Sequence, residues 1–264
     1  MSGALFAPER AAAALLGARR VPLRQKLAPL PPGARPSTMA EATATQVALA
    51  QLLGLSAPAG FKIGATAATM QRYLGLDGPA AGFMTHDNLH ASGSTLSIAP
   101  LLHPGVECEL AVHLAHDLPP GPCTADQAAA AVDLVMSAIE VVENRYADIA
   151  QFGTPALIAD QVFHAAAILG TPMTDWRPLD LAAIHGEICV NGKLVGQGHG
   201  RDLLGHPMNA LAWLAGSAEV AAFGGLRAGQ VIMLGSVTPP IWLDGPAEIE
   251  VRFSPLQATT LNLV

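Results

Sequence analysis

The run VECELAVHL at residues 106–114 constrains this 264-residue chain most, because it places two carboxylates inside an apolar stretch. Such a run is typical of a buried β-strand. Side chains alternate between the two faces of a strand, so Glu107 and Glu109 lie on one face, a few ångströms apart. Like charges held that close raise each other's pKa unless a cation lies between them.

Spacing alone leaves two interpretations of this pair open. A strand with one solvated face can carry two glutamates on that face without binding anything. Alternatively, a hard divalent cation with oxygen ligands, Mg²⁺ first, neutralises the pair. Glu107 and Glu109 are therefore candidate metal ligands.

The composition predicts a folded chain whose core needs no disulfides. Hydrophobic residues make up 51% and charged residues 13%, which argues against disorder. The net charge of −7 and the lack of a Lys/Arg-rich stripe argue against nucleic acid and anionic membrane as partners. No apolar run reaches the roughly 18 residues of a membrane helix. The cysteines are odd in number and lack CxxC spacing, which predicts free thiols in a reducing cytoplasm: Cys108, Cys123 and Cys189.

The N-terminal part, residues 1–75, reads as helical. Residues 11–18 follow Glu9 and Arg10 and precede two arginines, an order that favours an amphipathic helix over a secretory signal. Thr38 and Glu41 match a capping box for a helix that continues to Gly54. A shorter helix is expected over residues 66–74, ended by Gly75.

Residues 76–264 read as a β-rich core that forms one structural unit. Helices are expected from a capping box at 124–127 to about 136, over 159–169, and from Pro207 onward. Asn191-Gly192 predicts the turn of a hairpin over 187–195. Periodicity leaves 139–144 open between helix and strand. Further strands are expected at 106–114, 230–234, 247–253 and 259–263. The fold class predicted is α+β, with a helical N-terminal segment.

Several other residues could carry chemistry. Glu140 is flanked by apolar residues, where a carboxylate is rarely buried unless it is paired or binds a metal; the alternative is the wet edge of a helix. Lys62 lies between bulky apolar residues and can bind a carboxylate or move a proton, or it can be a snorkelling surface lysine. His199 and His206 flank a glycine-rich loop and are weaker candidates for substrate contact. GxSxG, HExxH and Walker A motifs are absent from the sequence.

From about residue 45 to the C-terminus, the chain resembles the 2-keto-4-pentenoate hydratase branch of the fumarylacetoacetate hydrolase superfamily. The set of fragments in this order is specific, although each fragment alone is weak. They are FKIGAT with MQRYLGLDGPAAGFM (61–84), VECELAVHLAHDLP (106–119), AIEVVENRYAD (138–148), PALIAD (155–160), DWRPLDLA (175–182), VNGKLVGQGHGRDLLGHPMNALAWLA (190–215) and LRAGQVIMLGS (226–236).

The resemblance implies a mixed β-roll core with peripheral helices, assembled as a homo-oligomer. It also implies that three acidic residues hold Mg²⁺ or Mn²⁺, here Glu107, Glu109 and Glu140, so that residues 139–144 form a strand. Lys62 matches the family lysine, and Asp87 is the match chosen for a further acidic position. The implied activity is that of a hydro-lyase of aromatic catabolism, which adds water to a 2-hydroxy-2,4-dienoate and yields a 4-hydroxy-2-oxo acid.

Other activities of this superfamily stay open. A decarboxylase of vinylogous 2-oxo acids of the 4-oxalocrotonate type shares the carboxylates and the lysine but takes a dicarboxylate. A second cation near the distal end of the substrate would favour it, and the sequence alone does not place the candidates Arg72, Arg145 and Arg201. A C–C hydrolase of acylpyruvates requires a water-activating base, often a His–Glu pair in a lid. A catalytically inactive partner subunit is disfavoured, because such a copy has no need to keep three like charges together.

The sequence departs from the family at three places, which concern the substrate more than the metal. Gln161 and Phe163 stand in a segment that usually reads Ala-Asp-Asn-Ala and are expected to narrow or reshape the pocket. Residues 243–246, LDGP, replace a Pro-Gly-Asp turn. Residues 238–240, TPP, replace a glycine-rich turn.

Overall fold

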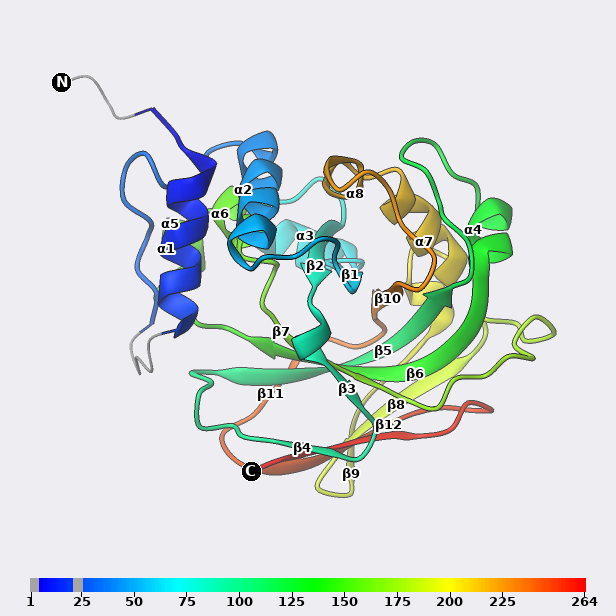
Figure 1. Cartoon of the computed structure of the whole chain (residues 1–264). Helices are drawn as coiled ribbons and strands as arrows, with labels where there is room; N and C mark the ends of the chain where they lie inside the picture. Colours follow the sequence, from blue (N-terminus) through cyan, green and yellow to red (C-terminus); the bar gives the residue numbers. More distant parts are fainter. Residues whose placement is uncertain (1–4, 21–25) are drawn as a thin grey trace.

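The computed structural model describes residues 5–20 and 26–264 of the chain. Within these residues the strands form two sheets, one of eight strands and one of five. Figure 1 shows α1, α2, α8, α7 and α4 along one side of the long curved strands β5 and β6, and the smaller sheet on the other side. This arrangement of sheets and covering helices confirms the α+β fold predicted from the sequence.

The larger sheet has the order β2-β1-β10-β5-β6-β7-β3, and β11 pairs with β5. The central pair, β5 and β6, is antiparallel over nearly its whole length. The strands are β1 (Gly60–Gly64), β2 (Ala80–Met84), β3 (Leu89–Ala91), β5 (Pro104–Leu114), β6 (Val132–Glu143), β7 (His164–Leu169), β10 (Val231–Ser236) and β11 (Ile241–Trp242).

The smaller sheet has the order β4-β13-β12-β8-β9. Its apolar side chains, such as Ile249, Val251 and Leu261, join the same core as those of the larger sheet. The strands are β4 (Ser94–Leu96), β8 (His185–Val190), β9 (Lys193–His199), β12 (Ala247–Phe253) and β13 (Thr259–Leu263). The hairpin at Asn191-Gly192 is confirmed, with φ of 51° and 74° at the two turn residues, as a primed turn requires.

The helices pack against the larger sheet. Their bounds are α1 (Pro8–Arg20), α2 (Met39–Leu52), α3 (Ala68–Leu74), α4 (Ala125–Ala131), α5 (Ile149–Phe152), α6 (Thr154–Ala159), α7 (Pro207–Ala215) and α8 (Ala218–Ala222). The predicted helix beginnings at Thr38, Thr124 and Pro207 are confirmed by side-chain caps or by proline in the first turn. At Thr38 the reciprocal bond differs, because Glu41 accepts from the backbone N–H of Ser37.

Two helix predictions were wrong. The helix that begins after Thr124 ends at Ala131, and β6 begins at Val132, because both edges of this segment pair with strands. The helix predicted over 159–169 does not form. Helix α6 ends at Ala159, and His164–Leu169 forms β7 beside β6. A left-handed turn at residues 161–163 separates the two elements.

The segment predicted to be helical, residues 1–75, also contains β1, and parts of it (1–4 and 21–25) lie outside the described residues. Strand β1 runs parallel to β10 and antiparallel to β2. Gly60 allows this close pairing, since a Cβ there would lie 1.8 Å from the carbonyl oxygen of Val231. Ala12 of α1 and Leu49 of α2 share a core with Phe61 of β1, so the N-terminal helices pack on the sheet.

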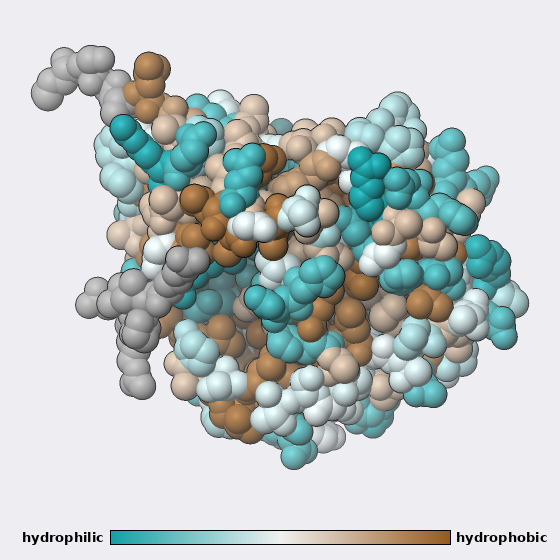
Figure 2. Space-filling model, viewed as in Figure 1, coloured by the Kyte–Doolittle hydropathy of each residue, from teal (hydrophilic) through white to brown (hydrophobic). Residues whose placement is uncertain are grey.

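In the described residues, no helix is both long and apolar enough to cross a membrane. On the face shown in Figure 2, apolar side chains are interspersed with polar ones. Among the described residues all three cysteines are free; Cys108 and Cys189 are buried, and Cys123 is half-buried.

Candidate metal centre and its cavity

Three carboxylates meet on one face of the β5–β6 pair. Glu107 on β5 lies directly opposite Glu140 on β6, and Glu109 follows two residues later on the same face of β5. One carboxylate oxygen from each residue lies within 4.8 Å of the others. The register of a single pair of strands therefore assembles the complete set.

The carboxylates are desolvated to different degrees. Glu109 and Glu140 are fully buried and Glu107 is half-buried. Burial and then the neighbouring Glu140 raise the pKa of Glu107 to about 8. Burial, followed by Glu140 and Glu107, holds the pKa of Glu109 well above its usual range. In the metal-free protein at neutral pH, Glu107 therefore keeps its proton, and the upward shift at Glu109 favours its protonated form.

Glu140 differs because two basic side chains contact it. The Lys62 Nζ lies 3.4 Å from Glu140 Oε1, and the His164 Nδ1 lies 2.8 Å from the same oxygen. Burial raises the pKa of Glu140, but Lys62 and His164 outweigh it, so the net shift is downward. Burial also lowers the pKa of His164, which favours the neutral imidazole.

Some polar atoms at this centre have no protein partner. Glu109 Oε2 accepts a hydrogen bond from the backbone N–H of Gly235 at 3.0 Å. Within the described part of the chain, Glu109 Oε1, Glu140 Oε2 and His164 Nε2 are buried without a hydrogen-bond partner. Buried polar atoms are normally satisfied, so oxygens left over on converging carboxylates fit the donor set of a hard divalent cation.

The turn that carries residues 161–163 presents its backbone to Lys62. Gln161, Val162 and Phe163 have φ of 64°, 49° and 66°, a left-handed conformation that is costly for β-branched valine. The Val162 carbonyl accepts a hydrogen bond of 2.9 Å from Lys62 Nζ. Because Lys62 is 2% exposed, its ammonium is held by this carbonyl and by Glu140 rather than by bulk water. Backbone strain of this kind is concentrated at functional sites.

A second buried network lies beside this turn. Asp160 is buried and accepts hydrogen bonds from Arg145, from the Tyr146 hydroxyl at 2.5 Å and from Arg19 Nη2 at 2.9 Å. Burial raises the pKa of Asp160, but Arg19 and Arg145 outweigh it, so the pKa lies below its usual range. This network anchors the start of the left-handed turn, since Asp160 directly precedes Gln161.

A cavity of about 720 Å³ opens onto the carboxylates. Lys62 and Glu107 line it at the metal-centre end. Its other walls come from α3, from the 161–163 turn and from the segment between β10 and β11, which includes Val237, Thr238, Pro239 and Pro240. Val162 and Phe163 point into this space as part of its lining.

The structure brings together four of the five residues proposed from the sequence. Glu107, Glu109, Glu140 and Lys62 form one cluster. Asp87 does not join them, because the segment His86–Asn88 forms an exposed 3₁₀ turn whose residues do not line the cavity.

Of the weaker candidate residues, only one lines the cavity. The His206 side chain caps α7, and His199 flanks the turn Gly200–Asp202; neither is part of the cavity lining. Phe163 does line the cavity, whereas Gln161 is buried outside its lining, beside Arg19. Sequence reasoning missed His164, since it lay inside the segment predicted to be a helix.

Comparisons with known proteins find relatives in both sequence and fold. Residues 65–261 match the family model described as Fumarylacetoacetate (FAA) hydrolase C-terminal. A 2-keto-4-pentenoate hydratase of Burkholderia vietnamiensis is 34% identical over 184 residues, which is 69% of each chain. A 2-hydroxyhexa-2,4-dienoate hydratase of Comamonas testosteroni is 34% identical over 197 residues, 74% of this chain and 72% of the relative.

A solved structure shares the fold over nearly the whole chain. The structure of 4-oxalocrotonate decarboxylase from Pseudomonas putida G7, complexed with magnesium and adipate, has a TM-score of 0.85 and 24% sequence identity. The match covers 99% of this chain and 100% of that chain. Together with the family match over residues 65–261, these similarities show that the chain belongs to the fumarylacetoacetate hydrolase family.

Proposed function

We propose that this protein is a divalent-metal-dependent hydratase of 2-hydroxy-2,4-dienoates. The observation that carries the proposal is the convergence of three carboxylates beside a buried lysine at one end of a largely apolar cavity. The hydratases of Burkholderia vietnamiensis and Comamonas testosteroni, similar over about 70% of the chain, support the same activity.

Glu107, Glu109 and Glu140 would hold Mg²⁺ or Mn²⁺. The oxygen-only donor set suits a hard cation, and the neighbour from Pseudomonas putida G7 is complexed with magnesium. When bound, the cation attracts electron density from the carboxylate and 2-oxygen of the substrate and so stabilises negative charge that develops there.

Lys62 is the proposed proton carrier. Its ammonium lies between Glu140 Oε1 and the Val162 carbonyl, at the end of the cavity where the substrate carboxylate would bind. In the reaction, the 2-hydroxyl proton leaves and a proton is added at the far end of the diene, which gives a 2-oxo-3-enoate. Water then adds across that double bond, with oxygen at C4 and hydrogen at C3, to give the 4-hydroxy-2-oxo acid. Lys62 can take or give a proton in the first step.

The alternative functions find less support in the cavity. A 4-oxalocrotonate-type decarboxylase must bind a second, distal carboxylate, yet among the described lining residues the only basic side chain is Lys62. A C–C hydrolase needs a water-activating base, but the His164 of the one His–Glu contact at this centre is buried in β7 and does not line the cavity.

One assay tests the proposal. Purified protein with Mg²⁺ is mixed with 2-hydroxypenta-2,4-dienoate and, separately, with 2-oxohex-3-enedioate. We expect 4-hydroxy-2-oxopentanoate from the first and little CO₂ from the second. EDTA should abolish the activity, Mg²⁺ or Mn²⁺ should restore it, and Zn²⁺ should restore it poorly.

Matched variants tie that activity to the centre. Glu109→Gln should remove activity, whereas Glu248→Gln, which alters an exposed glutamate of β12, should keep it. Activity that survives both EDTA and Glu109→Gln would overturn the proposal. A homo-oligomeric state and a cytoplasmic location stay predictions, to be checked by light scattering and by cell fractionation.

A further inference from the structure

We propose that the substrate of this centre carries an apolar chain longer than that of a five-carbon dienoate and has a single carboxylate, bound at the metal end. This proposal rests on the proposed hydratase function and specifies its substrate class. It follows from the chemistry and the size of the cavity beyond Lys62.

The distal walls of the cavity are mostly apolar, and the polar side chains among them, Thr69, Tyr73 and Asn144, carry no charge. Helix α3 contributes Met70 and Leu74, α5 contributes Ile149, and the left-handed turn contributes Phe163. Trp242 of β11 lines the same space, and its ring meets that of Phe163 edge-on, with centroids 6.3 Å apart. An alkyl or aryl chain loses no hydrogen bonds against such walls, whereas a carboxylate would lose hydration and meet no basic side chain among the described residues of the distal lining.

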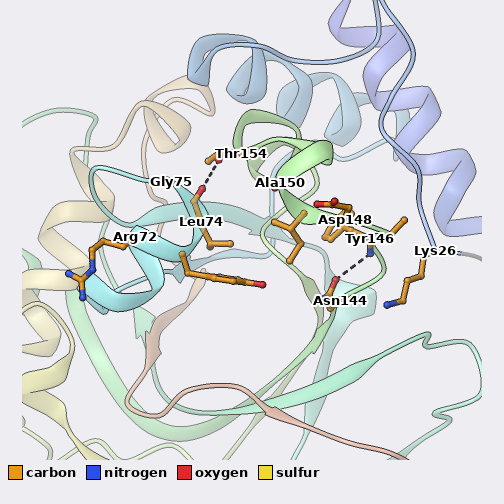
Figure 3. A pocket seen from close by; sticks show the side chains of 12 residues that line it. Lys26, Arg72, Leu74, Gly75, Asn144, Tyr146, Asp148, Ala150 and Thr154 are labelled. Atoms are coloured by element: carbon orange, nitrogen blue, oxygen red, sulfur yellow. Dashed lines mark hydrogen bonds between the residues drawn. The ribbon is translucent and has the colours of Figure 1, made fainter.

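The charges around the cavity also disfavour a distal carboxylate. Of the described residues that line it, the charged ones are Lys62 and Glu107 at the metal centre and Asp202, which is exposed. Asp202 repels a second anion. The cations Lys26 and Arg72 belong to an adjoining hollow of about 510 Å³ that shares Tyr73, Leu74, Asn144 and Ile149 with the cavity. Figure 3 shows Arg72 and Lys26 at opposite ends of that hollow.

The size of the cavity points to a longer substrate. Cavities of roughly 300–1,000 Å³ typically hold drug-sized ligands, and this one measures about 720 Å³. A five-carbon acid would leave its distal part filled with water against apolar walls. Each methylene that replaces this water should tighten binding about fourfold.

Binding of inert analogues measures this preference without turnover. Saturated 2-oxo acids keep the metal-binding end but lack the double bond that is hydrated, and calorimetry on the Mg²⁺-loaded protein gives their Kd. From 2-oxopentanoate to 2-oxooctanoate, Kd should fall about fourfold per methylene. 2-Oxohexanedioate should bind at least about tenfold more weakly than 2-oxohexanoate, because its second charge is desolvated without a partner.

Variants place the effect in the distal wall. Met70→Arg adds a cation there and should reverse the preference, so that 2-oxohexanedioate binds about tenfold more tightly than to wild type. Thr69→Arg, on the exposed side of the same wall, repeats the test if Met70→Arg unfolds below the assay temperature. Leu194→Arg adds the same charge to the exposed β8–β9 hairpin and should change neither Kd.

The outcomes separate the two proposals. Mg²⁺-dependent binding whose Kd is unchanged by chain length, or that favours the diacid, overturns the apolar-chain inference and leaves the hydratase proposal standing. Loss of diacid binding in Arg72→Gln or Lys26→Gln also overturns the apolar-chain inference, because the second carboxylate of the diacid would then reach the adjoining hollow. If no 2-oxo acid binds with Mg²⁺ and none of the dienoates is hydrated, the proposed function falls and the inference with it.

Discussion

Replacing Glu107 with glutamine tests the charge state of the metal-free centre. Burial and Glu140 raise the pKa of this carboxyl from 4.5 to about 8. The unfolded chain therefore loses this proton near pH 4.5, whereas the folded protein keeps it up to about pH 8. Across that interval the folded state binds more protons than the unfolded state, so the free energy of unfolding falls as the pH rises.

The magnitude follows from the width of that interval. Each pH unit lowers the free energy of unfolding by about 1.4 kcal/mol for one such group. The loss reaches roughly 3 kcal/mol at pH 7 and levels off at roughly 5 kcal/mol above pH 8. Glutamine has no proton to lose, so Glu107→Gln avoids this cost. For a domain of this size, 3 kcal/mol corresponds to about 6 °C in Tm.

Thermal unfolding of EDTA-treated protein between about pH 5 and pH 8.5 measures the effect. The Tm of Glu107→Gln should be close to that of wild type at the acidic end and should exceed it increasingly as the pH rises. The exposed-site control Glu248→Gln should show no pH-dependent gap. Mg²⁺ at pH 8 should raise the Tm of wild type but not that of Glu107→Gln. A constant gap across pH, or a variant less stable than wild type at pH 8, would refute the reasoning.

Three further predictions concern the lysine, the metal and the buried network. Lys62→Met should still bind Mg²⁺ while kcat falls about 10²-fold or more, and an unchanged kcat would make Lys62 a structural residue. Mg²⁺ binding at pH 7 should release about one proton or more per site, because Glu107 is still protonated there; equal calorimetric heats in buffers of different ionisation enthalpy would contradict this. Asp160→Asn should lower the free energy of unfolding at pH 7 by about 3–5 kcal/mol, since Arg145 and Arg19 lose their carboxylate. Because the pKa of Asp160 is lowered in the folded protein, the gap should shrink as acid protonates this carboxyl, which urea unfolding at several pH values would detect.

Local patterns predicted much of the secondary structure. The alternation of residues 247–253, the Asn191-Gly192 turn and Pro207 each act within a few residues, and each gave the observed element. Strand β1 escaped prediction because it is five residues long, with glycine at both ends, and follows a helical region. Its pairing with β10 joins residues about 170 positions apart, which no local pattern encodes.

The candidate site was predictable to the extent that a single strand defines it. Alternation along β5 placed Glu107 and Glu109 on one face. Glu140 required the family resemblance, since its segment fits a helix or a strand equally well. His164 and the left-handed turn were beyond prediction, because the turn depends on contacts with Lys62 and Arg19 from distant parts of the chain.

The cross-strand position of Glu107 opposite Glu140 has a consequence for how this fold can diverge. All three carboxylates belong to two neighbouring strands, whereas the distal cavity walls belong to α3, α5, the short strand β11 and connecting segments. A slip of one residue between β5 and β6 would turn Glu140 to the opposite face and abolish the donor set. Insertions in the connecting segments leave that register intact. Natural or designed variation can therefore change the accepted carbon chain while the pairing of β5 with β6 preserves the ion-binding chemistry.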